Sequence, residues 1–135
     1  MLTPYYARLQ TSQVDGAAFT ATAIGTILPA QAKFTLPANF LQFIGQDLRI
    51  RAAGRASTTT GTNTLTFSIV FGSIVVFASG AVTLIASQTN QSWCFDATLT
   101  LRAVGGGTTA NFMGIGNLYA SAAILTNGKD RKSVV

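Results

Sequence analysis

The chain has 135 residues, of which 48% are hydrophobic and only 10% are charged, against roughly 25% charged residues in an ordinary soluble domain. It contains no histidine and no glutamate. Because the usual proton-transfer groups at neutral pH are missing, we expect that the chain is not an enzyme. One cysteine and a few dispersed aspartates do not provide ligand spacing for a metal, and we expect no cofactor. The length fits one domain with a modest core.

A membrane-spanning helix is not predicted, although the mean hydropathy is +0.40. The longest near-apolar run, residues 69–78, is interrupted by Gly72 and Ser73, and a spanning helix needs about 20 consecutive apolar residues. The N-terminus lacks the charged and then apolar order of a secretory signal. We therefore expect synthesis in the cytoplasm, no contact with a membrane, and partner chains over part of the apolar surface.

The first predicted strand covers residues 19–28. Pro29 and Pro37 then predict an extended connection, because proline restricts φ and cannot donate a main-chain hydrogen bond. Within this connection we expect a short strand at 33–35 and one helical turn at 37–41.

Residues 48–52 alternate between apolar and cationic side chains. Leu48 and Ile50 share one face, while Arg49 and Arg51 share the other, which is the pattern of a half-buried strand.

Arg49, Arg51 and Arg55 lie close together in a chain of net charge +5. We interpret them as candidate interface residues: either the solvent face of one strand or ion-pair partners across a subunit contact. The other cations are spread thinly, so we expect no nucleic-acid partner. The threonine- and glycine-rich residues 56–63 predict a loop at the edge.

A hairpin is predicted over residues 64–79. Apolar residues alternate with threonine and serine up to Phe71, and a second β-rich run follows at 74–77. Gly72 and Ser73 between them are typical of a tight primed turn.

A second, longer hairpin is predicted from residue 93 to residue 120. Apolar and polar side chains alternate over 93–104, and glycines at 105–107 end that strand before a return strand at 108–120. The return strand contains Gly114 and Gly116, and glycine weakens a strand unless a neighbour needs the space. We expect Trp93 or Phe95 to cover that gap across the strand pair.

Short strands separated by turns, without helical crossovers, predict antiparallel sheets rather than a parallel α/β fold. The expected fold is an all-β, antiparallel β-sandwich, jelly-roll-like, with one domain over residues 1–129. The predicted structural core consists of the inward members of the alternating runs: Leu48, Ile50, Leu65, Phe67, Ile69, Phe71, Trp93, Phe95, Leu99 and Leu101.

From about residue 46 to residue 116 the sequence resembles a recurrent structural protein of tailed bacteriophages and prophages. The residues that carry the resemblance are LRIRAAGR at 48–55, FGSIVVFASG at 71–80, LTLRAVG at 99–105 and FMGIG at 112–116. The resemblance implies a β-sandwich or jelly-roll virion protein, of head-decoration or minor structural type, with no catalytic role. It also implies packing on other virion proteins and on further copies of itself.

Two functions follow as expectations. The first is a virion structural protein, such as a capsid decoration or minor head protein, that acts through subunit packing. The alternative is a tail-associated module that binds host-surface carbohydrate, for which Tyr5, Tyr6 and Tyr119 are the candidate aromatic residues.

Residues 130–135 are expected to be a non-native tail. Back-translated as GAT CGG AAG AGC GTC GTG, they correspond to a common short-read sequencing adapter. We therefore expect a truncated gene and an incomplete sandwich, without the strands that should cover the edge at residues 118–125.

Overall fold

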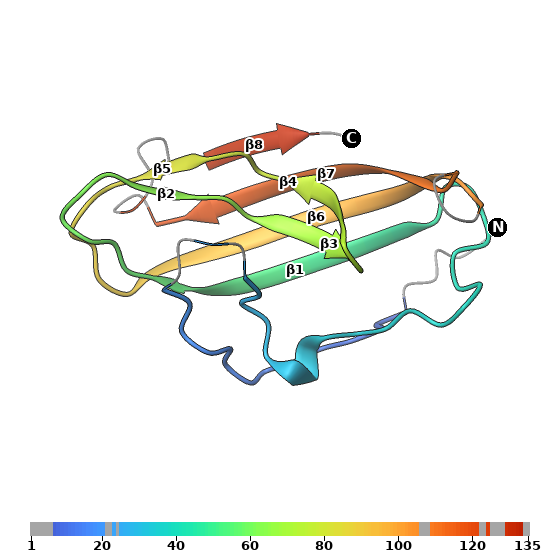
Figure 1. Cartoon of the computed structure of the whole chain (residues 1–135), viewed down its shortest axis with the longest axis horizontal. Coiled ribbons are helices and arrows are strands. Elements are labelled where there is room, and N and C mark those ends of the chain that lie inside the picture. The colour runs from blue at the N-terminus through green and yellow to red at the C-terminus, as the bar shows by residue number, and fades with distance from the viewer. Residues whose placement is uncertain are drawn as a thin grey trace. The chain divides into compact units, whose positions relative to one another are not determined.

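The computed structural model describes residues 7–20, 23, 25–105, 109–121 and 124, and the backbone of 129–133. The chain divides into two units, Met1–Phe40 and Leu41–Val135. The elements in chain order are η1 (Ala30–Ala32), β1 (Asp47–Ala56), β2 (Asn63–Leu65), β3 (Ser68–Phe71), β4 (Ile74–Ala78), β5 (Val82–Leu84), β6 (Gln91–Ala103), β7 (Asn111–Ala120) and β8 (Lys129–Ser133) (Figure 1). The described strands pair antiparallel and no α-helix occurs among the described residues, so the predicted all-β antiparallel class is confirmed.

The first unit contains one short 3-10 helix, η1, whose Ala32 N–H donates to the Pro29 carbonyl (2.9 Å). The strands predicted at 19–28 and 33–35 are wrong for the residues described, which form no ladder there. A strand needs a pairing partner for its main-chain groups, and none of the described segments supplies one here. The predicted helical turn is a single tight turn, in which the Phe40 N–H donates to the Pro37 carbonyl (3.2 Å).

The second unit contains a four-stranded sheet in the order β1-β6-β7-β8. The β1–β6 register runs from Asp47 opposite Thr100 to Ala56 opposite Gln91 without a shift. β6 then pairs with β7, with a register shift only near Leu101. The alternation over β6 seen in the sequence appears as alternating burial, with every second residue from Phe95 to Leu101 buried.

A long hairpin supplies the other strands of this unit. β3 and β4 pair around Gly72 and Ser73, where Gly72 has the positive φ of 60° that the first position of a type II′ turn requires. The sequence predicted that the hairpin closes at residue 79, but β2 pairs with β5, so it continues to residue 84. Between the two ladders, the Ser79 N–H donates to the Phe67 carbonyl (2.9 Å), and the Ser79 hydroxyl accepts from the Phe67 N–H (3.0 Å).

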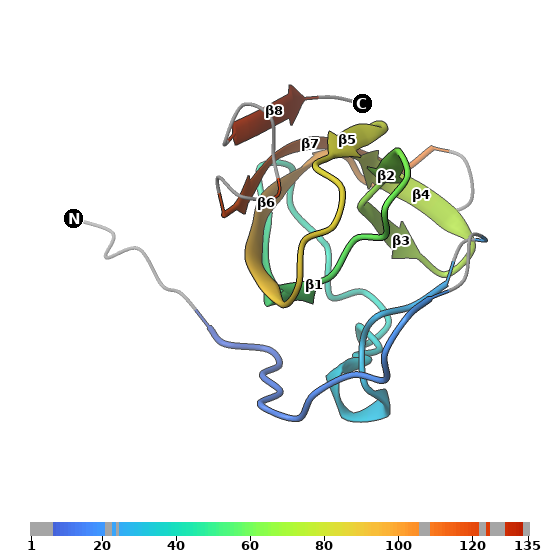
Figure 2. The ribbon, with the colours of Figure 1, turned by 90° about the vertical axis from the view of Figure 1, so that its left-hand side faces the viewer.

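The core lies between this hairpin and the sheet. Ile69, Phe77 and Val82 of the hairpin pack against the inward side chains of β6 and β7. The Phe77 and Phe95 rings, one from each layer, have centroids 5.6 Å apart. Figure 2 shows the hairpin strands over one face of the sheet.

The residues predicted as core divide by depth. Ile69, Phe95, Leu99 and Leu101 are buried. The others, including Leu65, are half-buried, and five of them pack against the buried cluster: Leu48, Ile50, Phe67, Phe71 and Trp93.

The prediction for Gly114 and Gly116 is wrong. A Cβ on Gly116 would lie 2.8 Å from the Phe77 ring, and one on Gly114 would lie 3.4 Å from the same ring and 3.0 Å from Leu99. The ring that occupies the space therefore comes from the facing layer rather than from the neighbouring strand. Trp93 covers a different glycine, Gly54, at which an added Cβ would be 2.7 Å from the indole.

Candidate interaction surface

The candidate functional region is the face of the sheet turned away from the hairpin, which we call the outer face. Its residues are the ones that alternate with the inward side chains: Asp47, Arg49, Arg51, Ala53 and Arg55 of β1; Ser92, Cys94, Asp96, Thr98, Thr100 and Arg102 of β6; and Asn111, Met113, Ile115, Asn117 and Tyr119 of β7. Strand pairing places most of them on one surface, because side chains directly opposite each other in a ladder share a face. Arg102 and Asn111, beside the register shift, belong to it by alternation along their own strands.

An ionic cluster lies in the part of this face formed by β1 and β6. Arg49 Nη2 is 2.8 Å from Asp96 Oδ2, and Arg49 Nε is 3.2 Å from Asp96 Oδ1. Arg51 Nε is 3.2 Å from the same Oδ2. Two guanidinium groups thus share one carboxylate, which leaves one positive charge over the cluster.

The two arginines lower the pKa of the Asp96 carboxyl below its ordinary value. The largest cause is the side-chain hydrogen bond from Arg49; burial opposes it, and the charges of Arg49 and Arg51 assist it. Both arginine side chains are 66% exposed, so water screens the cluster and its contribution to stability is small.

The remaining charges of the face are arranged around this cluster. The Thr100 hydroxyl donates to the Asp47 carboxylate at the start of β1. Arg102 Nη1 lies 3.5 Å from the Met113 sulfur. The side chain of Arg55, near the other end of β1, forms no hydrogen bond or ion pair with another described residue.

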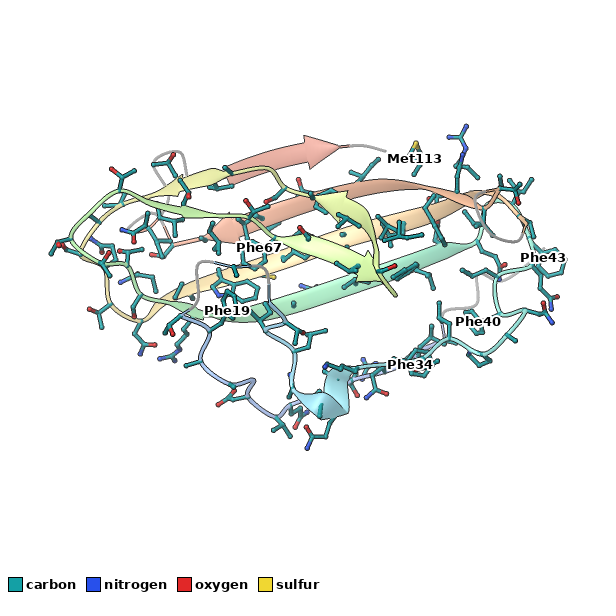
Figure 3. All side chains as sticks on the ribbon, in the orientation of Figure 1. Phe19, Phe34, Phe40, Phe43, Phe67 and Met113 are labelled. Atoms are coloured by element: carbon teal, nitrogen blue, oxygen red, sulfur yellow. The ribbon has the colours of Figure 1, made fainter. Side chains whose placement is uncertain are left out.

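Large apolar side chains are exposed at several places in this unit. On the outer face Ile115 is 52% exposed, beside Met113 and Tyr119. At the tip of the long hairpin the exposed residues are Val70, Ile74 and Val75, and before β1 they are Phe43 and Ile44, of which Ile44 is 69% exposed. In Figure 3, Phe43 lies at the end of the sheet where β1 begins. Their exposure makes these places candidates for a contact surface.

The structure brings together only part of the arginine set that the sequence suggested. Arg49 and Arg51 meet at Asp96, whereas Arg55 lies opposite Ser92 and outside the cluster. Asp96 was recognisable from the sequence as an outward residue, but not as the shared partner. The β1–β6 register makes it the partner, and no local pattern reveals that register.

No described group of three cysteine or aspartate side chains could hold a metal ion. Within the described ranges there is also no helix with the length and apolarity needed to cross a bilayer. The chain matches no protein-family model, no curated protein and no solved structure. The resemblance to tailed-phage virion proteins therefore remains a prediction that depends on the sequence motifs.

Proposed function

We propose that this chain is a non-enzymatic virion structural protein, a capsid decoration or minor head subunit that acts by packing on neighbouring subunits. The observation that carries the proposal is the placement of apolar side chains such as Ile44, Ile74 and Ile115 on the surface of an otherwise weakly charged domain. Covering such side chains stabilises a contact by roughly 25 cal/mol per Å² of apolar area removed from water.

The proposal extends to the fold, which we take to be a jelly-roll-like β-sandwich. β1 and β6 are neighbours in the sheet although the entire β2–β5 hairpin lies between them in sequence. The chain thus leaves the sheet, forms strands over one face and returns beside the strand it left. Connections between layers of this kind build Greek-key and jelly-roll sandwiches.

The partners proposed are other virion proteins and further copies of the chain. The outer face suits this role because it combines apolar residues, hydroxyls and a partly neutralised ionic cluster, a mixture typical of protein contacts. A nucleic-acid groove would require a continuous row of unpaired cations. Here Asp96 lies between Arg49 and Arg51.

Mass spectrometry of purified particles, from a phage or prophage that encodes this chain, tests the proposal. We expect the protein in the particles at a fixed ratio to the major capsid protein, and a phage enzyme made in the same cells serves as the control for contamination. Presence in the lysate together with absence from the particles would contradict the proposal.

The alternative, a tail-associated module for host carbohydrate, is favoured by one observation. Tyr119 is 43% exposed, and Asn117 lies two residues away on the same face, which offers a ring for stacking beside an amide. Tyr5 and Tyr6 lie outside the described residues. Glycan binding that is lost in the Tyr119→Ala variant and retained in the Tyr119→Phe variant, which keeps the ring, would support this function. No binding of the wild-type chain to any glycan on an array would count against it.

A further inference from the structure

The free edge of β1 is long and regular. β1 contains no proline and pairs with β6 over ten residues without a bulge. Among the described residues, no strand pairs with its other edge. An edge of this kind is a ready template for another strand.

The main-chain groups available at this edge can be assigned. The Leu101 N–H donates to the Gln46 carbonyl (2.9 Å), so residue 46 directs its main-chain groups at β6. Because that direction alternates along a strand, even-numbered residues of β1 bond to β6 and odd-numbered residues point their N–H and C=O groups away from it. Asp47, Arg51 and Arg55 therefore direct main-chain groups at an edge that no described strand pairs with, and their side chains lie on the outer face.

We propose that two copies of this chain pair through their β1 edges, antiparallel and about a twofold axis at Arg51, so that their sheets become one continuous sheet. In this register each Asp47 lies opposite the partner copy's Arg55, which gives two ion pairs. Arg49 lies opposite the partner copy's Ala53. Every directly opposite pair of odd-numbered residues from 47 to 55 then exchanges main-chain hydrogen bonds.

The inner face is self-complementary in the same register. Leu48 lies opposite the partner copy's Gly54, and Ile50 lies opposite the partner copy's Ala52. Ile50 therefore has a small side chain across the interface, whereas Leu48 meets the partner copy's Trp93 indole that covers Gly54. Both contacts bring apolar groups together on the inner face. The side chains on both faces of β1 therefore favour a twofold axis at Arg51.

Arg51 facing its own copy is the unfavourable contact in this arrangement. Asp96 offsets it, because each Arg51 Nε is 3.2 Å from Asp96 Oδ2 on the side away from the axis. Across the two β6 and two β1 strands of the dimer, the side chains in this row are then Asp96, Arg51, the partner copy's Arg51 and the partner copy's Asp96. Two carboxylates thus flank the two like charges.

Neighbouring registers are less favourable. An axis at Ile50 places Arg49 opposite the partner's Arg51 twice, and an axis at Ala52 places Arg49 opposite the partner's Arg55 twice. An axis at Arg49 restores opposite charges, since Asp47 then faces the partner's Arg51, but it pairs only residues 47–51 of the strand. The axis at Arg51 combines the long ladder with the fewest like-charge contacts.

This dimer deepens the proposed packing role and rests on it for its biological setting, but purified protein tests it alone. If particles contain the chain as a monomer, the dimer proposal is contradicted and the virion role is not. If the purified chain dimerises but is absent from particles, the virion role is contradicted and the dimer is not.

A disulfide scan in the full chain tests the register. With Cys94→Ser as background, Arg51→Cys places two thiols opposite each other with Cα atoms about 5.5 Å apart, within disulfide range. Homodimeric crosslinks at residue 49 or 53 would need to span about 13 Å along the strand and should not form. An equimolar mixture of Arg49→Cys and Ala53→Cys chains should crosslink only as the mixed dimer. Homodimeric crosslinking at residue 49 or 53 overturns the register, and crosslinking at none of the three positions overturns the pairing.

Charge reversal tests the same pairing without new thiols. Asp47→Arg or Arg55→Asp should each weaken dimerisation at least about tenfold in sedimentation equilibrium, since two attractions become two repulsions. The double variant should restore it to within about threefold of wild type. Thermal unfolding followed by circular dichroism checks that each variant is folded. A wild-type chain that remains monomeric at its highest soluble concentration, or a double variant that stays as weak as the single ones, refutes the proposal.

Discussion

The inner and outer faces of the sheet are built from the same strands, yet their side chains are under different constraints. Inner residues such as Leu99 contact the hairpin layer as well as their strand neighbours, and Leu99 has no exposed surface. Outer residues such as Arg51 pair with a side chain of the neighbouring strand and remain largely in water. Contact with a second layer, rather than membership of a strand, therefore determines how much a side chain contributes to stability.

The largest expected effect is truncation on the inner face. Leu99→Ala should lower the free energy of unfolding by about 2–5 kcal/mol, because it leaves a cavity between two layers. Thr98→Ala, one residue along the same strand on the outer face, should change it by less than about 0.5 kcal/mol. Urea unfolding of both variants measures the contrast, and equal losses at the two positions would contradict it.

Overpacking the same interface should have the next largest effect. Gly116→Ala places a Cβ 2.8 Å from the Phe77 ring and 3.2 Å from the Ala97 Cβ, at an expected cost of about 1–3 kcal/mol. The cost should shrink in a Phe77→Leu background, which removes the ring atoms nearest to the new methyl group. Gly61→Ala is the matched control, because nothing lies within 4 Å of its Cβ position. If the cost is the same in both backgrounds, Phe77 is not the obstacle.

Loss of the buried hydroxyl in the hairpin should cost somewhat less. Ser79 is only 4% exposed; its hydroxyl accepts from the Phe67 N–H and donates to the Gly80 carbonyl (2.8 Å). Ser79→Ala should destabilise the chain by about 1–2 kcal/mol, since it leaves a half-buried N–H without its side-chain partner. Hydrogen exchange should show faster opening at Phe67, whereas Ser68→Ala at an exposed position should leave that amide protected.

The smallest effect is expected at the ionic cluster. Asp96→Asn should cost at most about 1 kcal/mol at pH 7, because the arginines that it pairs with are exposed. Since folding lowers the pKa of Asp96, its contribution is fully present above the unfolded-state pKa of about 3.9. The contribution is lost as pH falls through the lower folded-state value. Wild type and variant should therefore converge in stability as pH falls through the folded-state pKa, and a difference that persists at lower pH would assign the effect to packing.

Much of the second unit was predictable from local patterns. Alternation over residues 93–101 predicted which side chains of β6 are buried, and Gly72 with Ser73 predicted the hairpin turn. Alternation failed in the first unit, where the strand expected at 19–28 does not form among the described residues. An extended apolar segment becomes a strand only if another segment pairs with it, and a sequence window does not contain that information.

The candidate surface was predictable in composition but not in arrangement. The sequence placed Arg49 and Arg51 on one face, because a strand repeats every two residues whatever surrounds it. It could not place Asp96 between them, since residues 49 and 96 are brought together only by the β1–β6 register.

Local sequence patterns were enough to predict the all-β class, the two-residue period that separates inner from outer side chains, and the position of the hairpin turn. These follow from backbone geometry acting over a few residues. Three features could be seen only in the folded chain: β2 pairs with β5, Phe77 occupies the space beside Gly116, and two arginines share Asp96. Each of these depends on groups separated in sequence whose approach is set by the packing of one layer on another or by strand register, and local periodicity carries no record of either.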